Sequence, residues 1–133
     1  MYLVDTNVLS ELPRKSPDPA VLGWFASLAT IAVSSISIEE LTFGVERARG
    51  KQREVLREWL ARLLAAGPRI VDVTSRVAVT AGRLRAARET KGKPVAQADM
   101  LIAACALEAG LVLATRNVRD FEGCGIALFN PFQ

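Results

Sequence analysis

The sequence predicts an α/β domain, an α/β/α sandwich in which helices cover both faces of a mostly parallel sheet of about five strands. Short apolar runs alternate with longer helical segments, the order that produces parallel strands joined by helices. The apolar runs lack polar–apolar alternation, as expected of strands buried on both faces. With 133 residues, 50% of them hydrophobic, the chain can build one core, and we expect a single domain over residues 1–133.

The expected elements follow from apolar runs and from the turn or capping residues beside them. Strands are expected over residues 2–4, 31–33, 70–73, 111–113 and 126–128. Helices are expected after Asp5 and over residues 19–28, 37–49, 52–66, 75–90 and 95–109. Asp18 and Thr74 stand where N-caps are needed, and Ser37 followed by Glu40 matches a capping box. Gly110 closes the last helix.

The chain contains no histidine, which excludes several classes of catalytic site. Ser-His-Asp and Cys-His catalysis, two-histidine ribonuclease chemistry and histidine-ligated zinc all require an imidazole. Cys105 and Cys124 match no metal-binding spacing, and we expect both to be reduced thiols. Catalysis would therefore depend on carboxylates, lysine, hydroxyls, thiols or a bound metal.

The net charge and the hydropathy pattern limit the partners of the chain. A net charge of +3 permits a polyanionic partner without requiring one. No basic and apolar leader precedes the first strand, so we expect no signal peptide. The most apolar stretch, residues 100–114, contains Glu108 and is shorter than the roughly 20 residues that span a bilayer. We therefore expect a cytoplasmic, soluble protein with no membrane partner.

Four carboxylates are expected at one edge of the sheet, where the strands end and where open parallel sheets bind ligands. Asp5 directly follows the first strand, and Glu40 lies in the first turn of the helix after the second. Asp120 follows the fourth strand. Asp99 lies near the start of the helix that precedes the fourth strand, and this helix must run antiparallel to that strand. Its start therefore lies at the same edge.

Each acid also has a simpler interpretation. Asp5 can serve only as the N-cap of the first helix, and Glu40 can serve only in the capping box. Asp120 in a loop can simply be solvated. Asp99 is expected beyond the first turn of its helix, on an apolar face, where an unpaired carboxylate costs several kcal/mol. An ion pair of Asp99 with Lys93 or Arg116 is the structural alternative.

The shared placement of these acids favours a cation site over four separate structural roles. Carboxylates gathered at one edge repel one another unless a positive charge lies among them. Oxygen ligands select a hard cation such as Mg²⁺, with Mn²⁺ as an alternative.

Four short motifs resemble those of the PIN-domain ribonucleases, especially the VapC-type toxins of bacterial toxin–antitoxin pairs and their FitB-like group. The motifs are Asp5-Thr6-Asn7, Glu40-Leu41 with Gly44, Ala98-Asp99 with Ile102-Ala103-Ala104, and Thr115-Arg116-Asn117 with Asp120-Phe121. The ending Phe129-Asn130-Pro131-Phe132 also resembles the FitB-like group. The resemblance covers essentially the whole chain and implies a PIN-like fold.

The resemblance also implies an activity and a set of partners. It implies an Mg²⁺-dependent endoribonuclease that leaves a 5′-phosphate and a 3′-hydroxyl, with Asp5, Glu40 and Asp99 as its acidic core. The fourth acidic position is Asp120 or involves Asn117. A cognate antitoxin and a homodimer are implied as partners. An apolar stripe, whose default role is core packing, is the candidate docking surface. The stripe contains Trp24, Phe25, Trp59 and Leu63.

Polar and basic neighbours of the acids have expected roles in the same site. Side chains expected to orient the carboxylates, or else to form ordinary turns, are Thr6, Asn7, Thr115 and Asn117. Arg116 and Arg119 are expected to contact substrate phosphates.

Two other classes of protein remain as alternatives. A phosphatase or receiver-like domain would use Asp5 to form an aspartyl-phosphate, but no second carboxylate lies beside Asp5 in the chain. The other alternative is a non-catalytic RNA- or protein-binding module on the same fold. The four acids argue against it, because a binding module has no need for carboxylates that repel one another.

Overall fold

The computed structural model describes residues 1–132 and contains one five-stranded sheet. Its strands are β1 (Tyr2–Val4), β2 (Ala32–Ser34), β3 (Arg69–Val71), β4 (Val112–Ala114) and β5 (Leu128–Phe129). They lie in the order β3-β2-β1-β4-β5, and every neighbouring pair is parallel. The predicted fold class is confirmed. β1 has the expected bounds, and the bounds of the other four strands differ from the expected ones by one or two residues.

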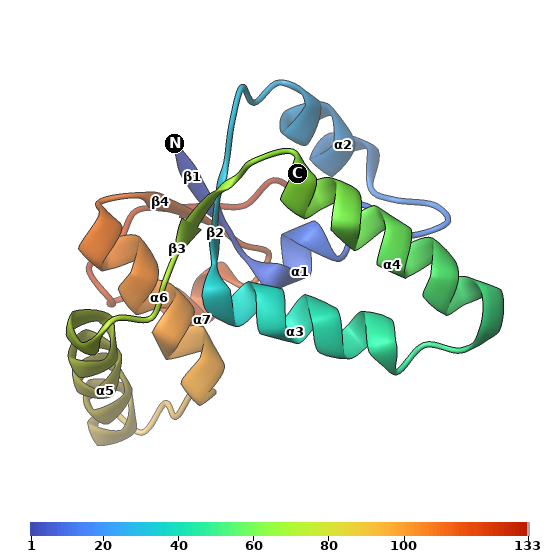
Figure 1. The fold of residues 1–133 in the computed structure, drawn as a ribbon. Coiled ribbons are helices and arrows are strands. Elements are labelled where there is room, and N and C mark those ends of the chain that lie inside the picture. Colours follow the sequence, from blue (N-terminus) through green and yellow to red (C-terminus); the bar gives the residue numbers. More distant parts are fainter. Residues whose placement is uncertain (133) are drawn as a thin grey trace.

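Helices cover both faces of this sheet, as Figure 1 shows. The helices are α1 (Thr6–Leu9), α2 (Pro19–Ala26), α3 (Ser35–Glu46), α4 (Gly50–Ala65), α5 (Ser75–Thr90), α6 (Gln97–Ala109) and α7 (Val118–Phe121). One layer contains α1 to α4, and the other contains α5, α6 and α7. None of the helices described for residues 1–132 is long and apolar enough to cross a membrane.

The alternation of side chains along the strands divides the core into two clusters. In β1, Leu3 packs with α5 and α6, whereas Val4 packs with α1 to α4. In the second strand, Ala32 and Val33 divide in the same way. Consecutive strand residues point to opposite faces, so strands of this kind must be apolar throughout. This burial explains why the strand sequences lack polar–apolar alternation.

The start of α3 corrects the predicted capping box. The N-cap is Ser34, the last residue of β2, whose hydroxyl accepts a hydrogen bond from the Ile36 amide at 3.1 Å. The helix begins as soon as the strand ends, so Ser37 lies inside it and Glu40 lies beyond its first turn. Glu40 is therefore not a capping residue.

The start of α6 corrects the expected position of Asp99. Ala96 has an extended backbone (φ −63°, ψ 142°) and is the N-cap, so the helix begins at Gln97 and not at Val95. Val95 packs against the core before the chain enters the helix. Asp99 consequently lies in the first turn, where the helix dipole favours its ionised form, and not beyond it.

Candidate active site

The site lies where the order of the strands reverses. From β1 the chain continues to β2 and β3 on one side, and later to β4 and β5 on the other. The carboxyl ends of β1 and β4 are therefore adjacent without a helix connecting them directly, which is where open α/β sheets bind ligands. Asp5 follows β1 and Thr115 follows β4, and the Asp5 amide donates a hydrogen bond to Ala114 O at 2.9 Å.

Three donors hold the Asp5 carboxylate, which is almost completely buried. Its Oδ1 accepts a hydrogen bond from the Thr6 amide at 2.7 Å. Its Oδ2 accepts from Thr115 Oγ1 at 2.8 Å and from Asn7 Nδ2 at 3.4 Å. Asp5 therefore is the N-cap of α1, as its simpler interpretation required. The same contacts fix its carboxylate at the edge of the sheet.

Burial and neighbouring acids raise the pKa of the Asp5 carboxyl. Desolvation is the largest cause, and it raises the pKa of Asp5 to about 6, against the lowering effect of its hydrogen bonds. The negative charges of Asp99 and Glu40 raise this pKa further. Their influence shows that these three acids, which are far apart in the sequence, lie close enough to repel one another.

A hydroxyl pair positions Glu40. Thr6 Oγ1 donates to Glu40 Oε1 at 2.7 Å, and it also lies 2.8 Å from Ser37 Oγ. Ser37 is completely buried and lies one helical turn before Glu40. Sequence reasoning gave this serine only a capping role. Its three-residue spacing from Glu40 also indicates that the two side chains share a face of α3.

Asp99 and Asp120 complete the acidic cluster. Burial raises the pKa of Asp99, and the charges of Asp120 and Glu40 raise it further. Asp120 lies in the short helix α7, which the sequence did not predict, and not in a loop. The ion pairs found within residues 1–132 include none with Asp5, Glu40, Asp99 or Asp120. The expected alternative, an ion pair of Asp99 with Lys93 or Arg116, is absent from the same part of the chain.

The donor set fits a hard cation that keeps part of its water shell. Across residues 1–132, no three Asp, Glu or Cys side chains are arranged as a ready-made metal cage. Mg²⁺ does not need one, because it is usually held by one or two carboxylates together with waters and substrate phosphates. Two acids without basic partners, the buried Asp5 and the half-buried Asp99, match this mode of binding.

The two predicted substrate arginines lie beside Asp120. A hollow of about 440 Å³ is lined by Arg116, Asn117, Val118, Arg119, Asp120 and Asn130. Arg116 Cζ lies 4.6 Å from the centre of the Phe132 ring, a cation–π contact that leaves the guanidinium exposed. Asn7 Oδ1 accepts a hydrogen bond from the Arg116 amide at 3.2 Å, and Thr115 Oγ1 accepts from the Asn117 amide at 3.1 Å.

Comparison with known proteins identifies the family of the chain. The PIN domain family matches residues 2–123. Toxin FitB of Neisseria gonorrhoeae is 38% identical over 100% of this chain and 99% of its own length. The VapC ribonuclease Y4jK of Sinorhizobium fredii is 35% identical with the same coverage.

Solved structures show the same likeness. The crystal structure of FitAcB from Neisseria gonorrhoeae superposes with a TM-score of 0.92 at 36% identity, covering 100% of this chain and 99% of that one. The structure of FitAB bound to the IR36 DNA fragment gives a TM-score of 0.90 at 36% identity, covering 100% and 96%. The chain thus belongs to the PIN-domain family as a VapC-type toxin ribonuclease of a toxin–antitoxin system.

Proposed function

We propose that the chain is an Mg²⁺-dependent endoribonuclease whose metal is held by Asp5 and Asp99. The observation that carries the proposal is the group of partly buried acids at the switch point of the sheet, which lack basic partners among residues 1–132. Mn²⁺ would satisfy the same oxygen ligands. When bound, the metal would polarise a phosphodiester oxygen and acidify a water molecule.

The residues around the metal ligands would act on the attacking water and hold Asp5 in place. Glu40, oriented by Thr6, would align or deprotonate the attacking water. Thr115 and Asn7 would hold Asp5 in its binding orientation. Asp120, whose charge acts on Asp99, is the better candidate for a fourth acidic ligand than the neutral Asn117.

The exposed basic residues beside the cluster would bind the substrate. Arg116 and Arg119 line one hollow with Asp120, so a phosphate held there would lie next to the acids. We further propose that residues 1–133 form one nuclease domain. It would act in the cytoplasm, where RNA is available.

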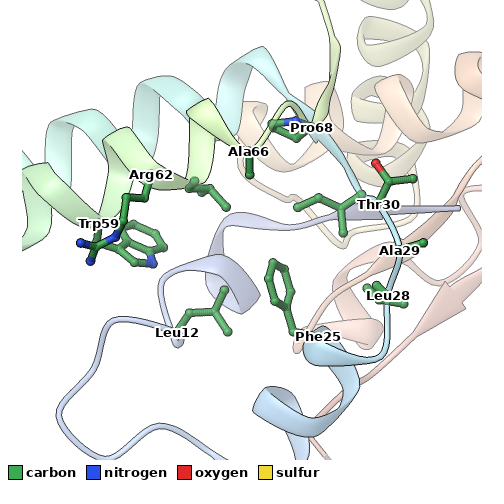
Figure 2. Close-up of a pocket in the computed structure, with 11 residues that line it drawn as sticks. Leu12, Phe25, Leu28, Ala29, Thr30, Trp59, Arg62, Ala66 and Pro68 are labelled. Carbon is green, nitrogen blue, oxygen red and sulfur yellow. The ribbon is translucent and has the colours of Figure 1, made fainter.

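An apolar cavity suits a protein partner, and we assign it to the cognate antitoxin. The cavity, of about 330 Å³, lies between α4, the start of β2 and the end of α2 (Figure 2). Phe25 and Trp59 line it, and so does Leu63, all three from the predicted apolar stripe. Trp24 does not line it, because its ring packs with Tyr2, Phe25 and Phe129. A homodimer remains part of the proposal.

Mapping of RNA ends tests the proposed activity. The purified protein is incubated with tRNA and rRNA, with and without Mg²⁺, and the products are sequenced at both ends. We expect internal cleavage only with Mg²⁺, leaving 5′-phosphates and 3′-hydroxyls.

The Asp99→Asn variant provides the control for contamination and for the metal site. Cleavage should fall by more than about 100-fold, because loss of a residue that merely orients a metal ligand already costs about 10- to 100-fold. Circular dichroism should show an intact fold. Cleavage by this variant at the parental rate would exclude the assigned site.

A further inference from the structure

We propose that a second cavity, beside Glu40, binds one nucleobase of the RNA next to the scissile phosphate. The cavity has a volume of about 280 Å³. Its wall includes Thr6 and Glu40, two residues of the proposed active site on which this inference rests. A phosphodiester held at the acids would therefore place a neighbouring base at the mouth of this cavity.

Gly44 is the first reason to regard the cavity as a binding site. It lies within α3, one turn after Glu40, in an ordinary helical conformation. Glycine at such a position costs about 1 kcal/mol relative to alanine. A Cβ at Gly44 would meet no other atom within 4 Å, so no close packing requires this glycine. What the missing side chain provides is open space in the cavity.

The remaining wall has the chemistry of a site for a single-stranded base. Trp59 provides an aromatic surface, and Leu41 and Leu56 line the interior. Aromatic side chains stack on bases of any sequence, and unpaired RNA bases are recognised in this way. Gln52 and Arg14, both exposed, also line the cavity and offer an amide for the edge of a base and a positive charge for a phosphate.

The position of Trp59 separates this cavity from the one assigned to the antitoxin. Trp59 lines both cavities, so the two are neighbours. The cavity beside Glu40 has polar and charged residues at its wall, namely Thr6, Arg14 and Glu40. The other cavity has Arg62 as its one charged lining residue in the described chain. The two charged lining residues, Arg14 and Glu40, and the place of Glu40 in the proposed active site favour RNA over a protein segment as the occupant.

Filling the cavity tests this assignment. The Gly44→Leu variant places a side chain in the cavity and should keep or raise the melting temperature. Gly82→Leu is the matched control, because Gly82 is also helical, has open space around it and lies on α5, in the other helical layer. Gly44→Ala adds a smaller side chain and should reduce cleavage less than Gly44→Leu does. It replaces the leucine variant in the test if that variant does not fold.

Cleavage of short single-stranded RNAs, each with one abasic position, identifies the bound base. For the wild-type protein and for Gly82→Leu, we expect one position flanking the cleaved bond at which base removal lowers kcat/KM about 10- to 100-fold, the range of base–aromatic stacking. Gly44→Leu should cut intact RNA with a similar loss and should not respond to base removal at that position. The assignment would be overturned if the losses in kcat/KM from Gly44→Leu and from base removal were additive. It would also be overturned if Gly44→Leu responded to base removal as the wild-type protein does.

A binding measurement separates this inference from the proposed active site. In a Trp24→Phe background Trp59 is the only tryptophan, since the chain has two. Intact RNA in EDTA should quench its fluorescence, whereas the abasic RNA and the Gly44→Leu variant should show no quenching. Base-dependent quenching without any Mg²⁺-dependent cleavage would refute the active site and retain the base pocket. Cleavage without base-dependent quenching would refute the pocket alone.

Discussion

Thr115 contacts three polar groups beneath the proposed metal site. It is completely buried at the end of β4. Its hydroxyl donates to Asp5 Oδ2 and accepts from the Asn117 amide, and Asn7 Nδ2 lies 3.4 Å away. Loss of this hydroxyl would free one oxygen of Asp5 to turn and would leave the Asn117 amide without its acceptor.

We predict that Thr115→Val, which keeps the shape of the side chain, weakens Mg²⁺ binding about 10- to 100-fold, as loss of a residue that orients a ligand does. Isothermal titration with Mg²⁺ measures this affinity directly. Thr115→Ser retains the hydroxyl and should bind Mg²⁺ almost as the parent does. Equal affinities of the valine and serine variants would show that the hydroxyl does not orient Asp5.

Asp5 makes the stability of the metal-free protein depend on pH. Its pKa is about 6 in the folded protein, against 3.8 as the ordinary value. Between these values the folded state holds more protons than the unfolded state, so the free energy of unfolding decreases as pH rises. The change amounts to about 3 kcal/mol at most, from roughly 1.4 kcal/mol for each pKa unit.

We predict that Asp5→Asn removes this part of the pH dependence. Urea unfolding in EDTA, at about pH 4 and about pH 7.5, should show a smaller loss of stability for the variant than for the parent. Addition of Mg²⁺ at the higher pH should stabilise the parent and not the variant. Identical pH profiles of the two proteins would contradict the burial of a titrating Asp5.

At the scale of elements, the connection between α1 and α2 is held by Glu11. This residue is buried, and its Oε2 accepts a hydrogen bond from the Asp18 amide at 2.8 Å, next to the start of α2. Its Oε1 accepts from Arg14 at 3.0 Å, and these bonds, the amide bond first, lower the pKa of Glu11. Arg14 and Pro13 of the same connection line the cavity beside Glu40.

We predict that Glu11→Ala lowers the free energy of unfolding by about 1–3 kcal/mol, because it leaves the Asp18 amide without its acceptor. Glu11→Gln keeps a carbonyl acceptor and loses only the pairing with the exposed Arg14, so it should cost less than about 1 kcal/mol. Chemical denaturation of both variants measures the difference. A glutamine variant as unstable as the alanine variant would show that charge, and not the amide bond, holds the connection.

At the scale of the whole molecule, the order of the strands assembles the site from four separate segments. With β1 central, the carboxyl ends of β1 and β4 meet, and α3 and α6 begin at the same edge. The acids then repel one another in the absence of a cation. A positively charged partner group could satisfy the same carboxylates.

We predict that the active protein arrests bacterial growth when it is expressed alone. Growth should recover when the adjacent small gene product, the expected antitoxin, is expressed with it, and Asp99→Asn should be harmless at equal protein levels. Colony counts after induction, with immunoblots for expression, give the result. High-level expression of cleavage-competent protein without growth arrest would argue against action as a toxin.

Local sequence signals determined the fold class and several helix ends, whereas both ends of α4 and the end of α2 differ from the expected ones by one or two residues. The apolar runs predicted five buried strands, and Asp18, Thr74 and Gly110 marked helix ends correctly, because capping depends on neighbours in the chain. The same local signals misplaced the starts of α3 and α6. Ser34 is buried and Val95 packs against the core, and the residues that surround them are distant in the sequence. A short stretch of sequence does not contain those neighbours.

The sequence by itself determined which residue types could carry the chemistry: no histidine, several carboxylates after strands, and two arginines beside one of them. The sequence also predicted that Asp5, Glu40, Asp99 and Asp120 gather at one edge of the sheet. Tertiary structure alone decided that Ser37 supports Thr6 and that Gly44 lines a cavity. The physical reason is the distance along the chain over which each interaction acts. Capping and periodicity act over one or two turns, whereas repulsion and cavities depend on residues that only the parallel sheet brings together.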